Sequence, residues 1–270
     1  MVEWLVAIVV GAIQGFVEWL PVSSEGAVAL ALTLLDTDPA VATQFALLLH
    51  AGTALAATVY YRDVLVDVFR TVPAWRPHSA FEGSQAAVSF FAIATLVSGV
   101  VGGAGYLAIS GFASAAAGGV FVAAIGALLL VTGLFMHVAE RRASESRDQP
   151  DPLDAILVGV LQGLAVLPGV SRSGTTVSAL LLRGHEGEAS LRLSFVLSIP
   201  AAFGAGLLVV LDDGLPTVDT GSALLALAVS ATVGYVTVDA LVRLVERVSF
   251  PRVCVGFGLL AIVGGGLLLL

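Results

Sequence analysis

The stretch PGVSRSGTT, residues 168–176, is the most polar string in an otherwise apolar chain. It brings Arg172, four hydroxyl side chains and two glycines together within nine residues. A charged side chain at membrane depth is costly and marks a functional site, and the planar guanidinium of arginine matches a phosphate or a carboxylate. A helix predicted to begin near Gly174 would point its free N–H groups at the same place. The string therefore predicts half of an oxyanion site.

The rest of the chain predicts a helical membrane protein. Of its 270 residues, 58% are hydrophobic and 12% are charged, whereas a soluble domain has about a quarter of its residues charged. A helix of about 20 residues crosses the roughly 30 Å of hydrocarbon in a bilayer. We expect one all-α, polytopic integral-membrane domain over 1–270, with six transmembrane helices at about 39–61, 84–111, 115–139, 190–211, 221–245 and 251–270.

Two further apolar regions, 2–35 and 154–184, are interrupted by LPVSSEG and LPGVSRSG. After each interruption, the apolar stretch is too short to cross a membrane. Irregular backbone is tolerated at membrane depth only where it is buried in protein or lines a wet cavity. These regions are therefore predicted to form two re-entrant helical hairpins, which enter the bilayer and return to the same side.

The two hairpins are similar in sequence. GAIQGFVEWLPVSSEG (11–26) aligns with GVLQGLAVLPGVSRSG (159–174) after one single-residue shift, and the following spans also correspond. We interpret the chain as an internal repeat over about 1–139 and 154–270, each copy being one hairpin plus three spans. An odd number of spans inverts the second copy relative to the first. The two hairpin tips are then expected to meet near the midplane.

The arginines indicate the orientation in the membrane. With both the N-terminus and the C-terminus outside, loops 62–83 and 140–153 lie inside, and each carries three arginines. The outer connections, such as 212–220, carry none. This agrees with the excess of basic residues in inner loops, with Arg172 as the one exception. The other arginines at the predicted inner face are Arg183, Arg192, Arg243, Arg247 and Arg252.

The balance of acidic and basic residues indicates the habitat of the protein and the kinds of partner it can bind. The 20 acidic residues outnumber the 12 basic ones, all of which are arginine. An acidic surface without lysine stays hydrated at very high salt, so the composition indicates such a habitat. The acidity also argues against nucleic acid as a partner. The single cysteine, Cys254, lies in an apolar run and is interpreted as a small core residue.

The first hairpin offers acidic and hydroxyl side chains for the same site. Gln14 and Glu18 are four residues apart and face the same side of a helix. Glu18 needs a partner at that depth, which is Arg172, a metal ion or a catalytic proton. Of Ser23 and Ser24 in the break, one is expected to cap the next helix, and the other is a nucleophile if a base is near. A purely structural Glu18–Arg172 pair is the alternative.

Glu25 and His50 each allow two interpretations. Glu25 would serve as a cation ligand or a proton acceptor, or would be a simple charge at the mouth of a cavity. His50, in the string LLLHAGT, would line the site or would pack between helices.

At these motifs the sequence resembles the undecaprenyl-diphosphate phosphatase family of the bacitracin-resistance type, over nearly the whole chain. The marks of that family are (Glu/Gln)-x-x-x-Glu, L-P-[VI]-S-S-x-G and P-G-x-S-R-S-x-x-T, which stand here at 14–18, 20–26 and 168–176. The resemblance implies six spans with two re-entrant hairpins in an inverted repeat. It also implies hydrolysis of a long polyprenyl diphosphate to the monophosphate, which recycles the lipid carrier of cell-envelope glycans, and a divalent cation, Mg²⁺ or Ca²⁺.

The predicted site combines the residue analysis with this resemblance. The expected catalytic residues are Gln14, Glu18, Ser24 and Arg172, with Glu18 also a candidate metal ligand. The expected substrate-binding residues are Ser23, Gly169, Ser171, Ser173, Gly174 and Thr176, and Glu25 and His50 are candidates for proton transfer or metal binding. The expected partners are the polyprenyl diphosphate, the cell membrane and a second copy of the chain.

One departure from the family pattern matters. The family usually reads S-S-T-G-H in the first break, and its histidine is implicated in catalysis, whereas this chain reads SSEGA with Ala27 at that position. Either Glu25 or His50 takes over proton transfer, or the histidine is dispensable, or the activity is lost. The competing function is a transporter that carries a lipid phosphate in the same pocket without cleaving it.

Overall fold

The computed structural model describes residues 2–115, 118–142, 147–212, 219–245 and 248–269. Arg247, which the sequence assigns to the inner face, lies outside these ranges, and so do 213–218 of the predicted outer connection 212–220.

The described residues form α-helices and two short 3₁₀ turns, with no strand among them. The α-helices are α1 (Val2–Val17), α2 (Ser24–Thr33), α3 (Pro39–Tyr60), α4 (Arg62–Thr71), α5 (Gln85–Ala115), α6 (Gly118–Arg142), α7 (Pro152–Leu164), α8 (Arg172–Leu182), α9 (Gly187–Asp212), α10 (Thr220–Val245) and α11 (Phe250–Leu267). The 3₁₀ turns are η1 (Val72–Ala74) and η2 (Pro77–Ser79).

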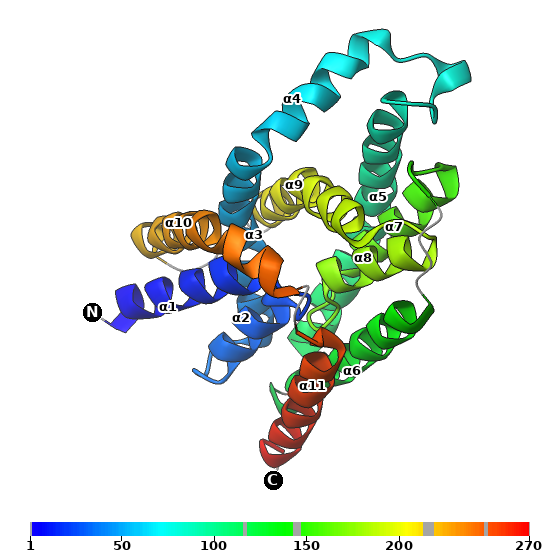
Figure 1. Cartoon of the computed structure of the whole chain (residues 1–270). Coiled ribbons are helices and arrows are strands. Elements are labelled where there is room, and N and C mark those ends of the chain that lie inside the picture. The colour runs from blue at the N-terminus through cyan, green and yellow to red at the C-terminus, as the bar shows by residue number, and fades with distance from the viewer. Residues whose placement is uncertain (1, 116–117, 143–146, 213–218, 246–247, 270) are drawn as a thin grey trace.

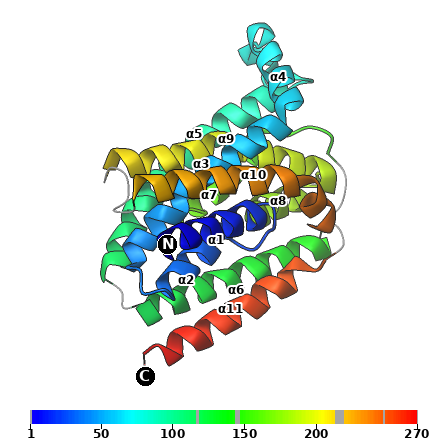
Figure 2. The ribbon, with the colours of Figure 1, turned by 90° about the vertical axis from the view of Figure 1, so that its left-hand side faces the viewer.

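Six of these helices are long and apolar enough to cross a membrane, namely α3, α5, α6, α9, α10 and α11. They correspond to the six predicted spans, which confirms an all-helical, multi-pass membrane protein. Large apolar side chains such as Leu96 and Leu260 are exposed on their outer surfaces, where lipid would contact them. In Figure 2 these helices lie side by side in layers, and both chain ends lie towards the left of the view.

The predicted inner loop 62–83 contains the helix α4, which the sequence analysis did not anticipate. In Figure 1, α4 leaves the end of α3 and extends away from the bundle. One of its faces is apolar and exposes Val66 and Phe69, and the other carries Asp63 and Asp67. A surface helix with these two faces is amphipathic.

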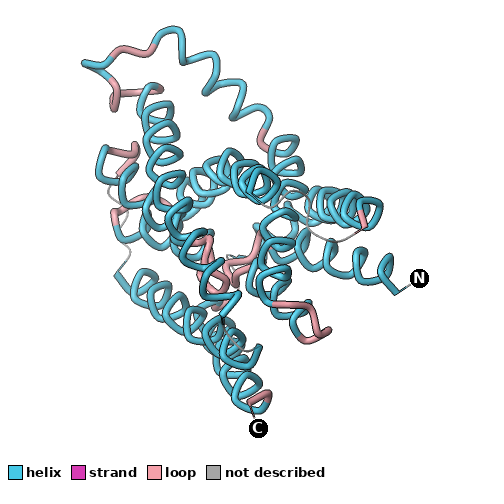
Figure 3. Tube along the Cα trace, turned by 180° about the vertical axis from the view of Figure 1, so that it is seen from behind, coloured by secondary structure: helices cyan, strands magenta, loops and turns pink. Residues whose placement is uncertain are grey.

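Two short helix pairs, α1–α2 and α7–α8, lie among the long helices. In each pair an irregular break separates the two helices, at 18–23 in the first pair and at 165–171 in the second. α1 packs along α10, α7 packs along α5, and α3 packs against α9. In Figure 3, loop segments lie at the centre of the molecule and helices surround them. The breaks thereby place non-helical backbone in the interior, where its polar groups find protein partners.

Small residues let the long helices approach closely. On α6 and α11, a Cβ added to Gly126 would lie 2.6 Å from the carbonyl oxygen of Gly258, and one added to Gly258 would lie 2.8 Å from the carbonyl oxygen of Gly126. Interfaces between membrane helices are rich in such residues because lipid supplies no hydrophobic driving force between helices, and close packing takes its place. The same two helices hold Met136 and Cys254, and Cys254 is buried as predicted.

Candidate functional site

The two breaks contact each other directly. The backbone N–H of Gly169 donates to Ser23 Oγ over 3.0 Å, and Ser173 Oγ donates to the carbonyl of Leu20 over 3.3 Å. Ser23 also caps α2 by accepting from the N–H of Gly26 over 3.2 Å. One serine of the pair Ser23–Ser24 is thus the predicted cap, and its hydroxyl joins both breaks.

The backbone at Gly169 explains why glycine occupies this position. Its φ is +102°, a region that side chains rarely adopt. A Cβ there would also clash with the carbonyl oxygen of Ile125 and would lie 2.9 Å from Cβ of Leu128, both on α6. The break therefore passes close to α6, and this close approach brings its N–H to Ser23.

Glu18 is the centre of the polar cluster at this junction. Its Oε2 accepts from Ser24 Oγ over 2.6 Å and from Gln14 Nε2 over 2.9 Å, while its Oε1 accepts from Arg172 Nη2. The side chain of Glu18 is 6% exposed and that of Arg172 is 15% exposed. The structure thus brings together the four side chains that the sequence predicts as catalytic.

Arg172 retains binding capacity after pairing with Glu18. Its Nη1 is buried and has no hydrogen-bond partner. The guanidinium carbon lies 5.5 Å from the centre of the Phe195 ring on α9, a cation–π distance. A buried guanidinium N–H without a partner costs free energy, which an oxyanion would recover by accepting from it.

Ser24 and Glu18 have the geometry of a nucleophile and its base. The hydroxyl donates its proton to a carboxylate oxygen at 2.6 Å, within hydrogen-bond reach. Ser24 begins α2, so the positive end of the helix faces the same place. The arrangement lets Glu18 take the proton as Ser24 Oγ attacks an electrophile.

His50 lies at the site. Its Nδ1 is 2.8 Å from the carbonyl oxygen of Ala46, which can only accept, so Nδ1 carries a hydrogen. Its Nε2 lies 3.4 Å from Glu18 Oε2. Of the two interpretations of this residue, the site-lining position is the one observed.

Glu25 supplies a second carboxylate at the same place. It is 3% exposed, and its Oε1 is buried without a hydrogen-bond partner. Together with Glu18, His50 and Arg172 it lines one end of a cavity of about 320 Å³. A further space of about 20 Å³ lies between the two breaks, enough for about one water molecule.

Several of the predicted substrate-binding groups already have partners within α8. The helix begins at Arg172, two residues before the predicted start, because Ser171 Oγ caps it by accepting from the N–H of Gly174 over 3.1 Å. Thr176 Oγ1 donates to the carbonyl of Arg172 over 2.8 Å and lies 2.7 Å from Ser194 Oγ. These groups hold the start of α8, and Ser171 and Ser173 also line the small space between the breaks.

The donor set bears on the expected cation. Among the described residues, no group of three or more His, Cys, Asp or Glu side chains could enclose a metal ion. Both oxygens of Glu18 have partners, which leaves Glu25 Oε1 as a free carboxylate oxygen. Mg²⁺ is often held by only one or two carboxylates plus substrate phosphates. The residues thus fit a cation that arrives with a phosphate, and they do not form a complete protein cage.

Sequence reasoning missed Phe195 and Trp19, which shape the site. Their rings meet edge to face at 5.3 Å, and Trp19 Nε1 donates to the carbonyl of Gly234 over 3.0 Å, which ties the first break to α10. Phe195 lies in the segment 194–206, which aligns with 44–56 and places Phe195 opposite Phe45, so this sequence alignment is the signal that could have drawn attention to it.

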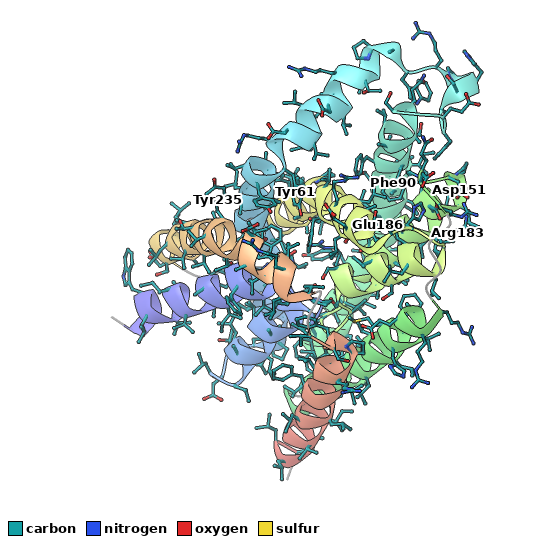
Figure 4. All side chains as sticks on the ribbon, viewed as in Figure 1. Tyr61, Phe90, Asp151, Arg183, Glu186 and Tyr235 are labelled. Carbon is teal, nitrogen blue, oxygen red and sulfur yellow. The ribbon has the colours of Figure 1, made fainter. Side chains whose placement is uncertain are left out.

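A second buried polar cluster, also missed, closes the base of α7 and α8. Arg183 Nε donates to Asp154 over 2.6 Å and its Nη2 to Asp151 over 2.6 Å, and His185 Nε2 lies 2.9 Å from Asp154. Figure 4 shows Asp151 and Arg183 together at this edge of the molecule. Burial would raise the pKa of Asp154, but hydrogen bonds from His185 and Arg183 lower it to about 2. The D-x-x-D spacing of a capping box was the available signal.

A multi-span helical membrane protein whose interior holds a hydroxyl, a carboxylate and a guanidinium in contact, with one guanidinium nitrogen unpaired, belongs to the class of membrane proteins with an anion site inside the helix bundle. The family model described as "Bacitracin resistance protein BacA" matches residues 7–264, and the chain belongs to that family.

Three relatives are similar to nearly the whole chain, and each is named undecaprenyl-diphosphatase. The protein from Haloarcula marismortui is 54% identical over 264 residues, covering 97% of both chains. That from Methanococcoides burtonii is 37% identical and covers 95% of this chain and 96% of the relative. That from Methanopyrus kandleri is 36% identical and covers 97% and 96%. The predicted family is thereby confirmed.

Proposed function

We propose that this protein hydrolyses a long-chain polyprenyl diphosphate, of the undecaprenyl type, to the monophosphate and inorganic phosphate, and so recycles a lipid carrier for cell-envelope glycans. The relatives named undecaprenyl-diphosphatase support the reaction. The observation that carries the proposal is Glu18, which accepts from both Ser24 and Arg172. This pairing joins a base, a nucleophile and an anion binder in one pocket.

In the proposed mechanism, the diphosphate enters the cavity and its terminal phosphoryl oxygens accept from Arg172 Nη1, which has no partner in the resting site. Ser24 Oγ attacks the terminal phosphorus while its proton passes to Glu18. The bond from that phosphorus to the bridging oxygen breaks, and the polyprenyl monophosphate leaves. A water molecule then attacks the phosphoserine: the bond from phosphorus to Ser24 Oγ breaks, Glu18 returns its proton to that oxygen, and inorganic phosphate leaves with the two protons of the water. Arg172 stabilises the charge in both steps.

The remaining polar residues support these steps. Gln14 donates to Glu18 over 2.9 Å and fixes its orientation. His50 lies 3.4 Å from Glu18, so it is placed to exchange the proton that Glu18 takes up, in the role that Ala27 cannot fill. Glu25, together with diphosphate oxygens, would hold a divalent cation, Mg²⁺ or Ca²⁺. Such a cation supplies charge neutralisation for the transferred phosphoryl group.

We propose that α1–α2 and α7–α8 are re-entrant hairpins of an inverted repeat over about 1–139 and 154–270, with both termini outside. The reciprocal packing supports this, because α1 lies along α10 as α7 lies along α5. Gly11 and Gly159, equivalent in the alignment, each approach a carbonyl on the helix they pack against. A second copy of the chain stays a proposed partner, to be tested by the mass of the purified protein in detergent.

The test is release of inorganic phosphate by the purified protein from undecaprenyl diphosphate, with Mg²⁺, with Ca²⁺ and with a chelator. Release with at least one cation is the expected result, and its absence under all conditions would refute hydrolysis. Bound lipid phosphate without release is the result expected of a transporter. A carrier would need Arg172 but would have no use for the hydroxyl that Ser24 donates to Glu18.

A further inference from the structure

The cavity that begins at the polar cluster continues between α5 and α9. Beyond Arg172, its lining is mostly small and apolar. It shares Gly103, Tyr106, Gly204 and Leu208 with a second, more open cavity of about 490 Å³. We call this continuous depression, from Gly99 through these four residues, the α5/α9 groove. It connects the site with the outer surface of the helix bundle.

The glycines of the groove leave space open. A Cβ added to Gly99, Gly103 or Gly204 would meet no atom within 4 Å. By contrast, one added to Gly163 on the neighbouring α7 would lie 2.6 Å from Val101. Close helix packing thus explains Gly163, whereas at the three groove positions no neighbour demands a glycine. The consequence of glycine there is an unfilled channel.

The two ends of the groove differ in chemistry. At the inner end, Glu25 and Gln162 are 3% and 4% exposed, and each has a buried side-chain oxygen without a partner. At the outer end, Leu107 and Leu211 are 71% and 75% exposed, as expected of lipid-facing side chains. A ligand that fits both ends has a polar head and a long apolar tail.

We propose that the α5/α9 groove binds the first isoprene units of the substrate and leads the rest of the prenyl chain into the lipid past Leu107 and Leu211. The inference rests on the proposed function, because the diphosphate at Arg172 places the tail at the start of the groove. A cavity of about 230 Å³ on the other side of the breaks is a poorer path, since Glu140 and Glu188 line it and Arg172 does not. The tail can then stay in an apolar environment throughout turnover.

Filling the groove tests this directly. Gly103→Leu and Gly204→Leu place a branched side chain in open space, so the fold is expected to tolerate them. Gly111→Leu is the matched control, because Gly111 is also on α5 with no atom within 4 Å of an added Cβ, and it lines neither part of the groove. The two substrates are undecaprenyl diphosphate and isopentenyl diphosphate, which has a single five-carbon unit.

The groove variants are expected to lower kcat/KM for undecaprenyl diphosphate about tenfold or more through KM. In these variants the added side chain and the prenyl tail would occupy the same space, and overfilling of a site weakens binding by about tenfold or more. Isopentenyl diphosphate, which has a single five-carbon unit and no long tail, should be hydrolysed as fast as by the unmodified protein, and Gly111→Leu should leave the hydrolysis of both substrates unchanged. An equal loss of kcat/KM for both substrates, or no loss for undecaprenyl diphosphate, would overturn the proposal.

A second measurement does not depend on hydrolysis. The thiol introduced by Gly103→Cys can be labelled with a small maleimide in detergent. The natural Cys254 is buried, so it should add little background labelling. Undecaprenyl monophosphate should slow labelling of this variant but not of Gly111→Cys, and inorganic phosphate should slow neither. If undecaprenyl monophosphate did not slow the labelling of Gly103→Cys, the proposal that the groove binds the prenyl tail would be overturned. Absence of phosphate release by the unmodified protein would instead refute the proposed function and leave this protection as the measure of tail binding.

Discussion

The buried pair of Glu18 and Arg172 leads to a prediction about stability as well as activity. Replacing Glu18 by Gln keeps the shape and removes the charge. It leaves Arg172, whose side chain is only 15% exposed, without its ion-pair partner. Removal of one partner of a buried ion pair costs about 3–5 kcal/mol of folding free energy, because the other charge stays buried. We expect Glu18→Gln to lose stability in this range.

The same substitution removes the base that accepts the proton of Ser24. Loss of a positioned general base costs about 10²–10⁴-fold in rate. Phosphate release should therefore fall by that factor. Added pyrophosphate should restore part of the stability of the variant, because an anion bound to Arg172 replaces the missing charge.

The double variant Glu18→Gln/Arg172→Gln separates the two effects. With both charges removed, it should be more stable than Glu18→Gln alone, although it should be equally inactive. The measurement is the free energy of unfolding in mixed detergent micelles, alongside phosphate release. A surface control is Asp239→Asn, which breaks an exposed pair with Arg243 and should cost no more than about 1 kcal/mol. Additive losses in the double variant would refute the reasoning.

Three further predictions concern single residues. Ser24→Ala should abolish phosphate release, whereas Ser230→Ala, which removes another buried hydroxyl, bonded to a backbone carbonyl, should not. Turnover by Ser24→Ala would assign the attack to water. The pKa of Asp154 is lowered from 3.8 to about 2. The ionised side chain therefore contributes about 2 kcal/mol to the folding free energy above pH 4, and this contribution is lost as the pH falls through 2. When the free energy of unfolding is measured against pH, this acid-dependent loss should be absent in Asp154→Asn. Gly169→Ala should destabilise by several kcal/mol through its positive φ and the clash with α6, whereas Gly187→Ala, with no atom near, should not; equal stabilities would contradict the close approach.

The helices and the meeting of the breaks follow from short-range signals. Apolar runs of membrane-spanning length predict the spans, and an arginine in such a chain predicts a buried anion partner. The inverted repeat that the sequence predicts would place equivalent breaks at the same depth, and from it we expect Arg172 and Glu18 to face each other. Each of these signals can be recognised from composition and spacing, and the structure places Arg172 on Glu18.

The finer assignment of donors could not be predicted in the same way. PGVSRSGTT contains four hydroxyls and several N–H groups, but hydroxyl side chains also hydrogen-bond to their own helix. Thr176 donates to the carbonyl of Arg172, and the Gly174 N–H donates to Ser171 Oγ, which removes both from the free donors. Phe195 and the Asp154 cluster depend on contacts between distant segments, which periodicity does not report. The number of polar residues at a site therefore overstates the number available to a ligand.

The contact between Glu18 and Arg172 has a consequence for how binding and chemistry are coupled. In the resting site Glu18 and Arg172 neutralise each other, so one oxygen of the base is bound to the guanidinium and both buried charges are stabilised. In the proposed mechanism, an arriving diphosphate accepts from Nη1, the side of the guanidinium that Glu18 leaves unpaired, so the two anions would share one cation. Glu18 would then be held less tightly by Arg172 while it keeps its contact with Ser24, and it would accept the hydroxyl proton more readily. Activation of Ser24 would thus be favoured when an anion has reached Arg172. Arg172→Lys, which keeps the charge but loses the planar fork, should therefore reduce kcat as well as raise KM.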